Sequence, residues 1–484
     1  MNIRRNLAFN FLLSASQIIF PLVTIPYITR VLDPEGVGKV AFIDSLTYFF
    51  TVIAEFGIVT YGIREVARVQ GDPAERSKVV SELLLIQFIA SSIAMVLYGA
   101  AILFWFDKIG DPILVVLSAC FFLANFLYCE WYFWGRERFR YITVRSMAIR
   151  LAGIVAIFLL VREQQDNRMY YGVMVGSSIA VLASNFIVMA RQNDISFREL
   201  AARRHIRPLL VNFGISLTYS ITTLTDVPVV RLAAGVHAAG LYVMAARMVK
   251  LSSSVLTDIF LVLYPHTVRV AMQDDKAHLY RTLPDYSDLL LAISLPASAL
   301  LFLCAPDIVR ILLGPSFADV TPQIEWLSPY PAIVSFSLFL NKQVLMVHDR
   351  EDRVLRALLV GNLFFLPACI FMATKYSGPG ACIALVTAES IILAFNFIYC
   401  RNLLPNVELV RFRSVLRTIA GIALLFPLRW AIARIGMGPV GQLGLTLALS
   451  LALLIPWTLW ITRPRIGLEF ATALRTRIKP RNLG

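Results

Sequence analysis

Eight basic side chains lie inside long apolar segments of this sequence, where an isolated charge is costly. Arg150 and Arg247 fall near the middle of their segments, and Lys250 follows Arg247 by three residues, on the same face of a helix. A guanidinium offers a planar pair of donors to phosphate oxygens, and an ammonium offers a compact point charge. These residues therefore indicate an anion-binding chamber within a membrane. The eight are Arg30, Arg145, Arg150, Arg247, Lys250, Lys342, Arg417 and Arg429.

Acidic side chains in the same segments leave a second interpretation open. If each carboxylate pairs with a base, the charges hold helices together and no cationic chamber results. Only Glu389 among the acids falls near a segment's middle, whereas the other deep charges are basic, so we favour a net-cationic cavity over purely structural ion pairs. The acids are Asp44, Glu55, Glu130, Asp226, Asp258 and Glu389.

The sequence carries no signal of catalysis or of a bound cofactor. It contains no CxxC pair, no Cys/His cluster and no GxxxxGK[ST] loop, which argues against a zinc site, a disulfide framework and ATP hydrolysis. Five histidines lie at loops and segment ends, and each is interpreted as a surface residue rather than a catalyst (His205, His237, His266, His278 and His348). We therefore predict no enzymatic activity, no catalytic residue, no metal and no cofactor.

The composition shows what must position these charges. Hydrophobic residues make up 58% of the 484 and charged residues 16%, against about 45–50% and about 25% in a globular domain. The net charge of +14 comes from short basic clusters between apolar runs, whereas a nucleic-acid binder gathers its basic residues on one polar surface. The sequence thus predicts an all-α polytopic membrane protein that binds no nucleic acid.

Fourteen segments are long enough to cross about 30 Å of hydrocarbon, which needs roughly 20 apolar residues. The first begins after Arg4 and Arg5 and is too long for the apolar region of a signal peptide. The predicted spans are 7–30, 39–62, 81–106, 113–134, 141–161, 169–190, 208–232, 238–265, 287–305, 324–347, 355–374, 379–400, 414–433 and 440–462.

Basic residues test this count, because loops on the cytoplasmic side carry an excess of Lys and Arg. Most of the basic residues between the predicted spans lie on alternate connections, starting with the N-terminus and ending with the tail from Arg463 to Arg481. A miscounted span would disrupt the alternation beyond the error. The pattern therefore predicts fourteen helices with both termini in the cytoplasm.

An internal repeat predicts how the helices are grouped. An offset of 202 residues places Asn10-Phe11 on Asn212-Phe213, Pro26 on Pro228 and Gly38 on Gly240. An even number of spans separates the copies, so they share one orientation, as in parallel transporter repeats. We predict two six-helix bundles, residues 1–200 and 201–405, followed by two helices and a basic tail in residues 406–484.

Several short motifs, in this order and spacing, resemble those of the polysaccharide (O-antigen type) flippases of the multidrug/oligosaccharidyl-lipid/polysaccharide exporter superfamily. The resemblance covers the first twelve predicted helices. The motifs are Pro21-Leu-Val-Thr-Ile-Pro26, Gly36-Val-Gly38, Phe56-Gly57-Ile, Tyr61-Gly62-Ile-Arg64-Glu65, Trp131-Tyr-Phe-Trp-Gly135, Gly314-Pro-Ser-Phe317 and Gly378-Pro-Gly380.

The resemblance implies a carrier of undecaprenyl-pyrophosphate-linked oligosaccharide units, from the inner to the outer leaflet of the bacterial inner membrane. The head group is then expected on Arg30, Arg150, Arg247 and Lys250, with Arg145 near the entrance. Coupling to H⁺ or Na⁺ is expected, and Asp44 and Glu389 are the candidates for gating or ion coupling. Expected partners are the lipid-linked substrate, membrane lipids and polysaccharide polymerase or chain-length proteins.

Four alternatives remain open at this stage. A drug/cation antiporter of the same superfamily would place carboxylates rather than arginines at the middle of the membrane. A flippase for peptidoglycan lipid precursors is a second option. A membrane-embedded sugar-transfer enzyme would need a clustered acid/base site, and an assembly scaffold would tolerate neutralisation of the deep arginines.

Overall fold

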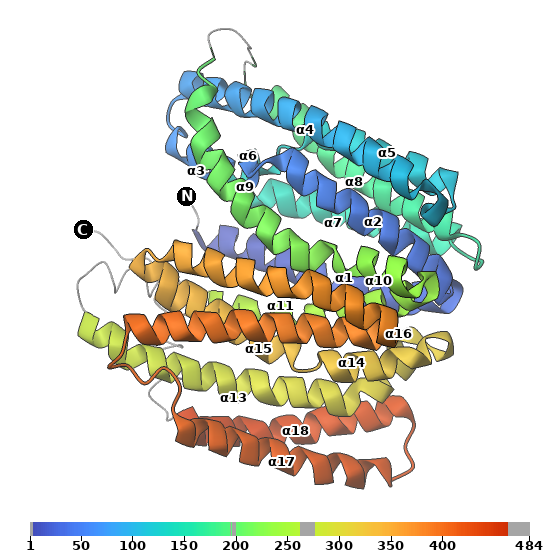
Figure 1. Ribbon diagram of the computed structural model, residues 1–484, viewed down its shortest axis with the longest axis vertical. Coiled ribbons are helices and arrows are strands. Elements are labelled where there is room, and N and C mark those ends of the chain that lie inside the picture. Colours follow the sequence, from blue (N-terminus) through green and yellow to red (C-terminus); the bar gives the residue numbers. More distant parts are fainter. Residues whose placement is uncertain (1–2, 194, 196–199, 262–275, 463–484) are drawn as a thin grey trace. The chain divides into compact units, whose positions relative to one another are not determined.

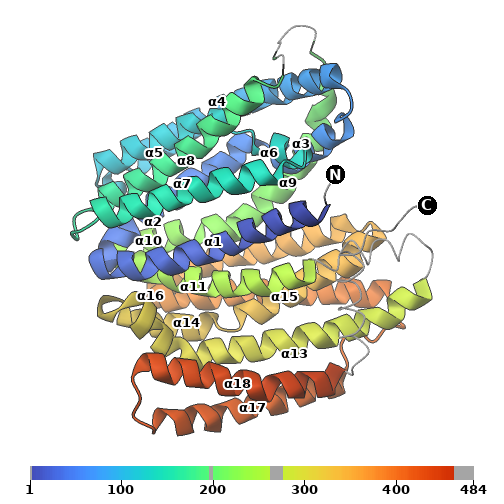
Figure 2. The ribbon, with the colours of Figure 1, turned by 180° about the vertical axis from the view of Figure 1, so that it is seen from behind.

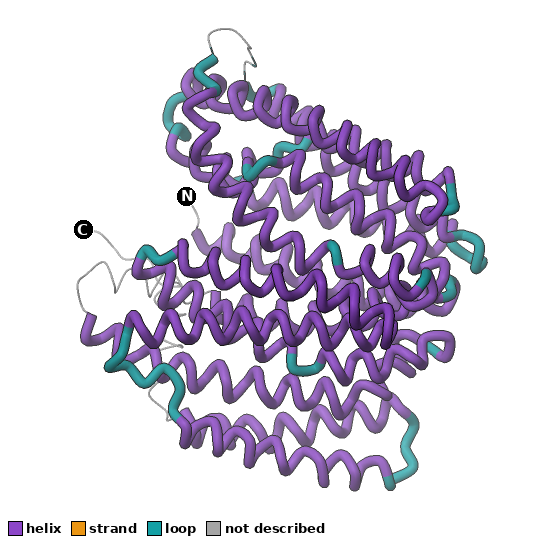
Figure 3. Tube along the Cα trace, viewed as in Figure 1, coloured by secondary structure: helices purple, strands orange, loops and turns teal. Residues whose placement is uncertain are grey.

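The computed structural model describes residues 3–193, 195, 200–261 and 276–462. Within them the regular structure is helical, with short 3-10 and π turns and no strand (Figure 3). The prediction of an all-α polytopic membrane protein is confirmed. The basic tail from Arg463 to Arg481, which is predicted to be cytoplasmic, lies outside the described residues.

Contacts divide the chain into two compact units, residues 1–240 and 241–484. This two-part division does not separate the C-terminal pair of helices, so the three-part organisation given by the repeat remains a prediction. The first unit contains ten helices among its described residues (Figures 1 and 2). They are α1 (Ile3–Val31), α2 (Pro34–Glu55), α3 (Ile58–Arg68), α4 (Pro73–Ile109), α5 (Pro112–Ala124), α6 (Glu130–Gly135), α7 (Phe139–Leu160), α8 (Asn167–Ala190), α9 (Arg203–Leu224) and α10 (Asp226–Ala234). The next helix, α11 (Val236–Leu261), begins in the first unit and continues into the second.

Three helices of the first unit begin at an Asp-Pro pair. The carboxylates of Asp33, Asp72 and Asp111 accept hydrogen bonds from backbone N–H groups in the first turns of α2, α4 and α5, at 2.7–3.2 Å. The proline that follows has no N–H group, so it leaves no unpaired donor in the first turn of the helix. Its fixed φ angle is also the one that a helix start requires. The pair therefore fixes where each of these helices begins.

Three predicted spans of the first unit are interrupted in the structure. The span 39–62 breaks between α2 and α3, where Phe56 and Gly57 have left-handed backbone angles. The span 113–134 loses regular α-helix between α5 and α6, and the span 208–232 breaks at Thr225, between α9 and α10. Breaks in membrane helices free backbone groups and often lie near binding sites.

A close helix crossing accounts for one glycine pair of the repeat. A Cβ atom on Gly38 would overlap the Val236 carbonyl oxygen, and one on Gly240 would overlap that of Pro34. Val236 and Gly240 are the residues that the 202-residue offset assigns to Pro34 and Gly38. The contact is therefore reciprocal between the two segments that the offset aligns.

The described part of the second unit continues with α13 (Lys276–Ile308), α14 (Thr321–Leu327), α15 (Tyr330–Phe339), α16 (Glu351–Leu403), α17 (Phe412–Ala433) and α18 (Pro439–Thr462). Helices α17 and α18 form a hairpin that packs against α13 (Figures 1 and 2). Ion pairs fasten α13 to the start and the body of α17: Arg411 with Asp285 and Asp288, and Arg429 with Asp307.

Ten of the described helices are long and apolar enough to cross a membrane. One of them, α16, has 53 residues, roughly 80 Å at about 1.5 Å per residue, which is more than twice the hydrocarbon thickness. Its helix is broken at Ser377, where φ is 56°, so its two halves match the predicted spans 355–374 and 379–400. The total of fourteen spans remains a prediction.

Candidate functional site

Helix α7 carries two of the predicted anion-binding arginines, Arg145 and Arg150, and packs against α1 and α8. Both side chains are only partly exposed. Arg150 is within electrostatic range of both Arg145 and Glu130. The structure thus brings the two arginines into one charged cluster inside the first unit, which we call the Arg145 cluster: Ser16, Glu130, Arg145, Ser146, Arg150 and Asn185.

Arg145 is held by partners from three segments. Its Nη1 donates to Oδ1 of Asn185 on α8, and its Nη2 donates to Ser146 Oγ at 2.8 Å. The Nη2 to Glu130 Oε1 distance is 3.5 Å, and the guanidinium lies 5.7 Å from the centre of the Tyr141 ring. The side chain is 8% exposed, so these contacts fix a guanidinium that is largely removed from solvent.

Two donors in this cluster lack a hydrogen-bond partner. Arg145 Nε and Asn185 Nδ2 are both buried and unpaired. A buried donor without an acceptor costs about 1–3 kcal/mol, and more when it is charged. Both atoms are donors, so the group that would satisfy them is rich in acceptors, as phosphate oxygens and sugar hydroxyls are.

Arg150 joins α7 to α1. Its Nη1 donates to Ser16 Oγ at 2.8 Å, and the Ser16 hydroxyl donates in turn to the Leu13 carbonyl oxygen at 2.6 Å. The guanidinium lies 5.8 Å from the centre of the Phe20 ring. These contacts use one edge of the guanidinium, which can therefore accept an anion on another edge.

The remaining predicted residues of the first unit lie elsewhere. Arg30 is exposed in the last turn of α1, where its Nη1 donates to the Pro26 carbonyl oxygen at 2.6 Å. Asp44 is partly buried on α2 and is within electrostatic range of Tyr171 on α8. Their assignment to head-group binding and to gating remains a prediction.

In the second unit, Arg247 and Lys250 are partly buried on α11. Lys250 is within electrostatic range of Glu389 on α16. The structure therefore brings together a base predicted to bind the head group and an acid predicted to gate or couple to an ion. Whether either residue contacts a ligand remains a prediction.

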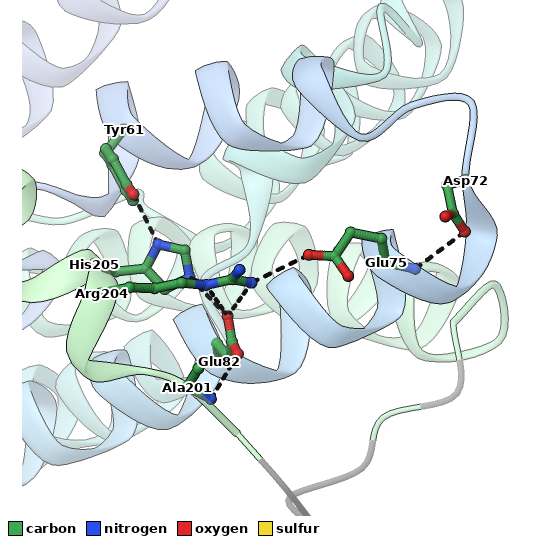
Figure 4. Close-up of polar contacts among 7 residues, drawn as sticks. All are labelled: Tyr61, Asp72, Glu75, Glu82, Ala201, Arg204 and His205. Atoms are coloured by element: carbon green, nitrogen blue, oxygen red, sulfur yellow. Dashed lines mark hydrogen bonds and ion pairs between the residues drawn. The ribbon is translucent and has the colours of Figure 1, made fainter.

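A second buried charged cluster of the first unit is absent from the sequence predictions. We call it the Glu82 cluster: Tyr61, Glu75, Glu82, Ala201, Arg204 and His205 (Figure 4). The fully buried Glu82 carboxylate accepts from Arg204 at 2.7 and 3.1 Å and from the Ala201 N–H at 2.8 Å. Nε2 of His205 lies 2.7 Å from the same carboxylate, and its Nδ1 lies 2.7 Å from the Tyr61 hydroxyl.

The placement of His205 corrects one sequence interpretation. The sequence predicts a surface position for His205, but the residue is 2% exposed. If Nε2 donates to Glu82, Nδ1 accepts from the Tyr61 hydroxyl and a neutral imidazole is fully paired. The polar ring can therefore be buried without a penalty, and it fastens the start of α9 to α3 and α4.

Two of the motifs that carry the family resemblance meet in the packing of α3 against α6. A Cβ atom on Gly62 would lie 2.8 Å from the Trp131 ring, and one on Gly135 would lie 2.8 Å from the Ile63 carbonyl oxygen. Gly57 has φ of 75°, and a Cβ atom there would lie 2.5 Å from the Phe213 nitrogen. Gly62 and Gly135 thus allow α3 to pack closely against α6, the helix that begins with Glu130, and Gly57 allows the close approach of α9.

Sequence reasoning included Glu130 only among the acids inside spans and did not single out Asn185. A signal for Asn185 was available, because an amide within an apolar span usually needs a partner there. No sequence signal identifies that partner as Arg145, which is 40 residues away.

Comparisons with known proteins agree with this architecture. A family described as "Polysaccharide biosynthesis protein" matches residues 3–270, more than half of the chain. A protein of Escherichia coli (strain K12) described as "Putative O-antigen transporter" is 20% identical over 405 residues, which cover 83% of this chain and 97% of that protein.

Two solved structures share the fold. "Lipid II flippase MurJ, inward closed conformation" has a TM-score of 0.73 at 12% identity, covering 95% of this chain and all of that one. A multidrug resistance MATE family transporter of the MOP superfamily, in an inward-facing conformation, has a TM-score of 0.56 at 14% identity, covering 84% of this chain and 99% of its own. The prediction that the chain is not an enzyme agrees with these descriptions, which are of transporters and flippases.

Proposed function

This chain belongs to the polysaccharide biosynthesis protein family, and we propose that it is a flippase for undecaprenyl-pyrophosphate-linked oligosaccharide units. It moves them from the inner to the outer leaflet of the bacterial inner membrane, for the synthesis of O-antigen or another surface polysaccharide. The relative described as "Putative O-antigen transporter" supports the glycan class.

One observation carries the proposal: the buried Arg145 guanidinium has an unpaired Nε beside the unpaired Nδ2 of Asn185. Inside a membrane protein such donors need an acceptor-rich partner. A pyrophosphate supplies several charged oxygens, and the adjoining glycan supplies hydroxyl groups. A cationic drug brings no anionic oxygens and is repelled by the arginines, so the multidrug antiporter alternative is disfavoured.

The other charged residues have proposed roles in the same transport cycle. Arg150 holds a second phosphate oxygen, and Arg30, Arg247 and Lys250 are further candidates for anion contacts. Transport proceeds by alternating access and is coupled to H⁺ or Na⁺, with Asp44 and Glu389 as candidate coupling or gating groups. Both termini lie in the cytoplasm, and polysaccharide polymerase and chain-length proteins are the expected partners.

Complementation tests this proposal. Four proteins are expressed in a strain that lacks its O-antigen flippase: wild type, Arg145→Ala, Arg150→Ala and the control Arg356→Ala, whose arginine side chain is exposed. Surface O-antigen and the amount of inserted protein are measured together. We expect wild type and Arg356→Ala to restore export. Each cluster variant should export at least about tenfold less O-antigen than wild type at equal insertion, as loss of a charge-assisted hydrogen bond implies.

Two results would contradict the proposal. Full export by the Arg145→Ala, Arg150→Ala double variant would show that the cluster does not bind substrate. Rescue of a strain depleted of its peptidoglycan-precursor flippase, without rescue of O-antigen export, would assign the chain to the other lipid-linked substrate.

A further inference from the structure

The Arg145 guanidinium is held more closely by its neutral partners than by its charged one. The Ser146 hydroxyl accepts at 2.8 Å, whereas the single contact to the Glu130 carboxylate is 3.5 Å. Charge-assisted hydrogen bonds are usually 2.7–2.9 Å long and often bidentate when arginine meets a carboxylate. The ion pair between Arg145 and Glu130 is therefore a weak one.

The surroundings of Glu130 allow its side chain to leave Arg145 without moving the backbone. Glu130 is the first residue of the six-residue helix α6, which is anchored by the buried aromatic residues Trp131, Tyr132 and Phe133. The Glu130 side chain is 26% exposed, against 8% for Arg145. The Glu130 side chain therefore has room to rotate away while the guanidinium stays in place.

The charges around Glu130 favour an exchange of anions. Arg145 and Arg150 attract a carboxylate, and Glu55 on α2 also lies within electrostatic range of Glu130. A phosphate oxygen arriving at Arg145 replaces one negative charge by another, so the guanidinium is never left uncompensated in the membrane. The exchange also supplies the acceptors that Arg145 Nε and Asn185 Nδ2 lack.

We propose that Glu130 is a resident competitor of the substrate: its carboxylate occupies Arg145 when no substrate is bound, and the anionic head group displaces it. This inference rests on the proposed function. The competition lowers affinity for the head group, and the returning carboxylate promotes release. A carrier needs both properties, because a site that binds too tightly does not let its cargo leave.

Binding of a soluble probe tests this role. Four proteins are reconstituted in nanodiscs: wild type, Glu130→Gln, Glu130→Asp and the control Glu163→Gln, whose residue lies in an exposed loop. Their affinity for farnesyl pyrophosphate is measured by titration calorimetry. Farnesol serves as the control for binding through the lipid tail. Glu130→Gln removes the competing charge and keeps the size of the side chain. We expect roughly fivefold tighter binding, the upper end for a partly exposed ion pair, and slower dissociation of the probe.

The two other variants sharpen the expectation. Glu130→Asp keeps the charge but withdraws it by one methylene group from a contact that is already long, so its affinity should fall between wild type and Glu130→Gln. Glu163→Gln changes the net charge equally and should bind as wild type does. If Glu130→Gln cannot be purified, the shift in Glu130→Asp decides the test alone.

The possible failures are distinguishable. Wild-type protein that does not bind farnesyl pyrophosphate, or binds farnesol equally well, counts against the proposed function itself. If wild type binds farnesyl pyrophosphate but Glu130→Gln binds it equally well or more weakly, only the competitor role is overturned. Weaker binding by Glu130→Gln would mean that Glu130 positions Arg145.

Discussion

The Glu82 cluster and the Arg145 cluster both set a carboxylate against a guanidinium inside the first unit, but they differ in completeness. Both Glu82 oxygens are used, by three donors at 2.7–2.8 Å and a fourth at 3.1 Å. His205 completes its own pairing through Tyr61. In the Arg145 cluster the ion pair is 3.5 Å long and two buried donors are unpaired.

The difference separates two uses of buried charge. A fully paired network fixes one packing arrangement, and its loss leaves uncompensated polar groups. A network with unpaired donors retains the capacity to bind, at the cost of some stability in the absence of ligand. We therefore assign the Glu82 cluster to fastening α9 onto α3 and α4, and the Arg145 cluster to the substrate.

The largest expected effect follows from breaking the complete cluster. In Glu82→Gln an amide replaces the carboxylate, so Arg204 loses its buried counter-charge. The Arg204 side chain is itself 43% exposed, so the main cost is a buried donor left without a charged acceptor, about 1–3 kcal/mol, and the free energy of unfolding in mixed detergent micelles should fall by that amount. Glu75→Gln is the control, because Glu75 meets the same arginine at 3.3 Å but is 41% exposed; its cost should stay below about 1 kcal/mol. Equally small losses of unfolding free energy in Glu82→Gln and Glu75→Gln would show that the buried network does not stabilise the packing of α9 against α3 and α4.

A smaller effect is expected from the incomplete cluster, and on binding rather than on folding. Asn185→Ala removes an acceptor for Arg145 and the unpaired donor Nδ2. Farnesyl pyrophosphate should bind about tenfold more weakly, as loss of one or two hydrogen bonds implies. Ser178→Ala on the same helix is the control, because its hydroxyl donates to the Met174 carbonyl oxygen of that helix at 3.0 Å. If Asn185→Ala binds as wild type and loses as much stability as Glu82→Gln, the distinction between the clusters is wrong.

Much of the fold could be predicted from the sequence, because a membrane requires long apolar helices with internally paired backbone groups. The breaks at Phe56 and Thr225 could not, since single backbone angles leave little trace in hydropathy. Gly57 is required at the first break by the close approach of Phe213, a contact that exists only in the folded chain.

The charged residues of the candidate site could be predicted from the sequence, but their partners could not. Arg145 and Arg150 were identified because a charge in an apolar segment is costly whatever surrounds it. Their partners Ser16 and Asn185 come from distant segments and are defined by tertiary packing. Glu82 and His205 are missed by the sequence analysis because they lie 123 residues apart. Glu82 falls at the edge of the predicted span 81–106 and His205 just before the span 208–232, positions where a polar residue is ordinarily exposed.

The smallest expected effect comes from the edge of the Glu82 cluster. Tyr61→Phe removes the hydroxyl that lies 2.7 Å from His205 Nδ1 and leaves the contact between His205 and Glu82 in place. One lost hydrogen bond should lower the free energy of unfolding by about 1 kcal/mol, measured in the same micelles, and surface O-antigen should be unchanged. Tyr376→Phe, at a tyrosine that is 50% exposed, controls for loss of a hydroxyl. If Tyr61→Phe abolished export while stability and insertion stayed normal, the Glu82 cluster would take part in transport, and its complete pairing would describe one state of a moving element rather than a fixed fastening.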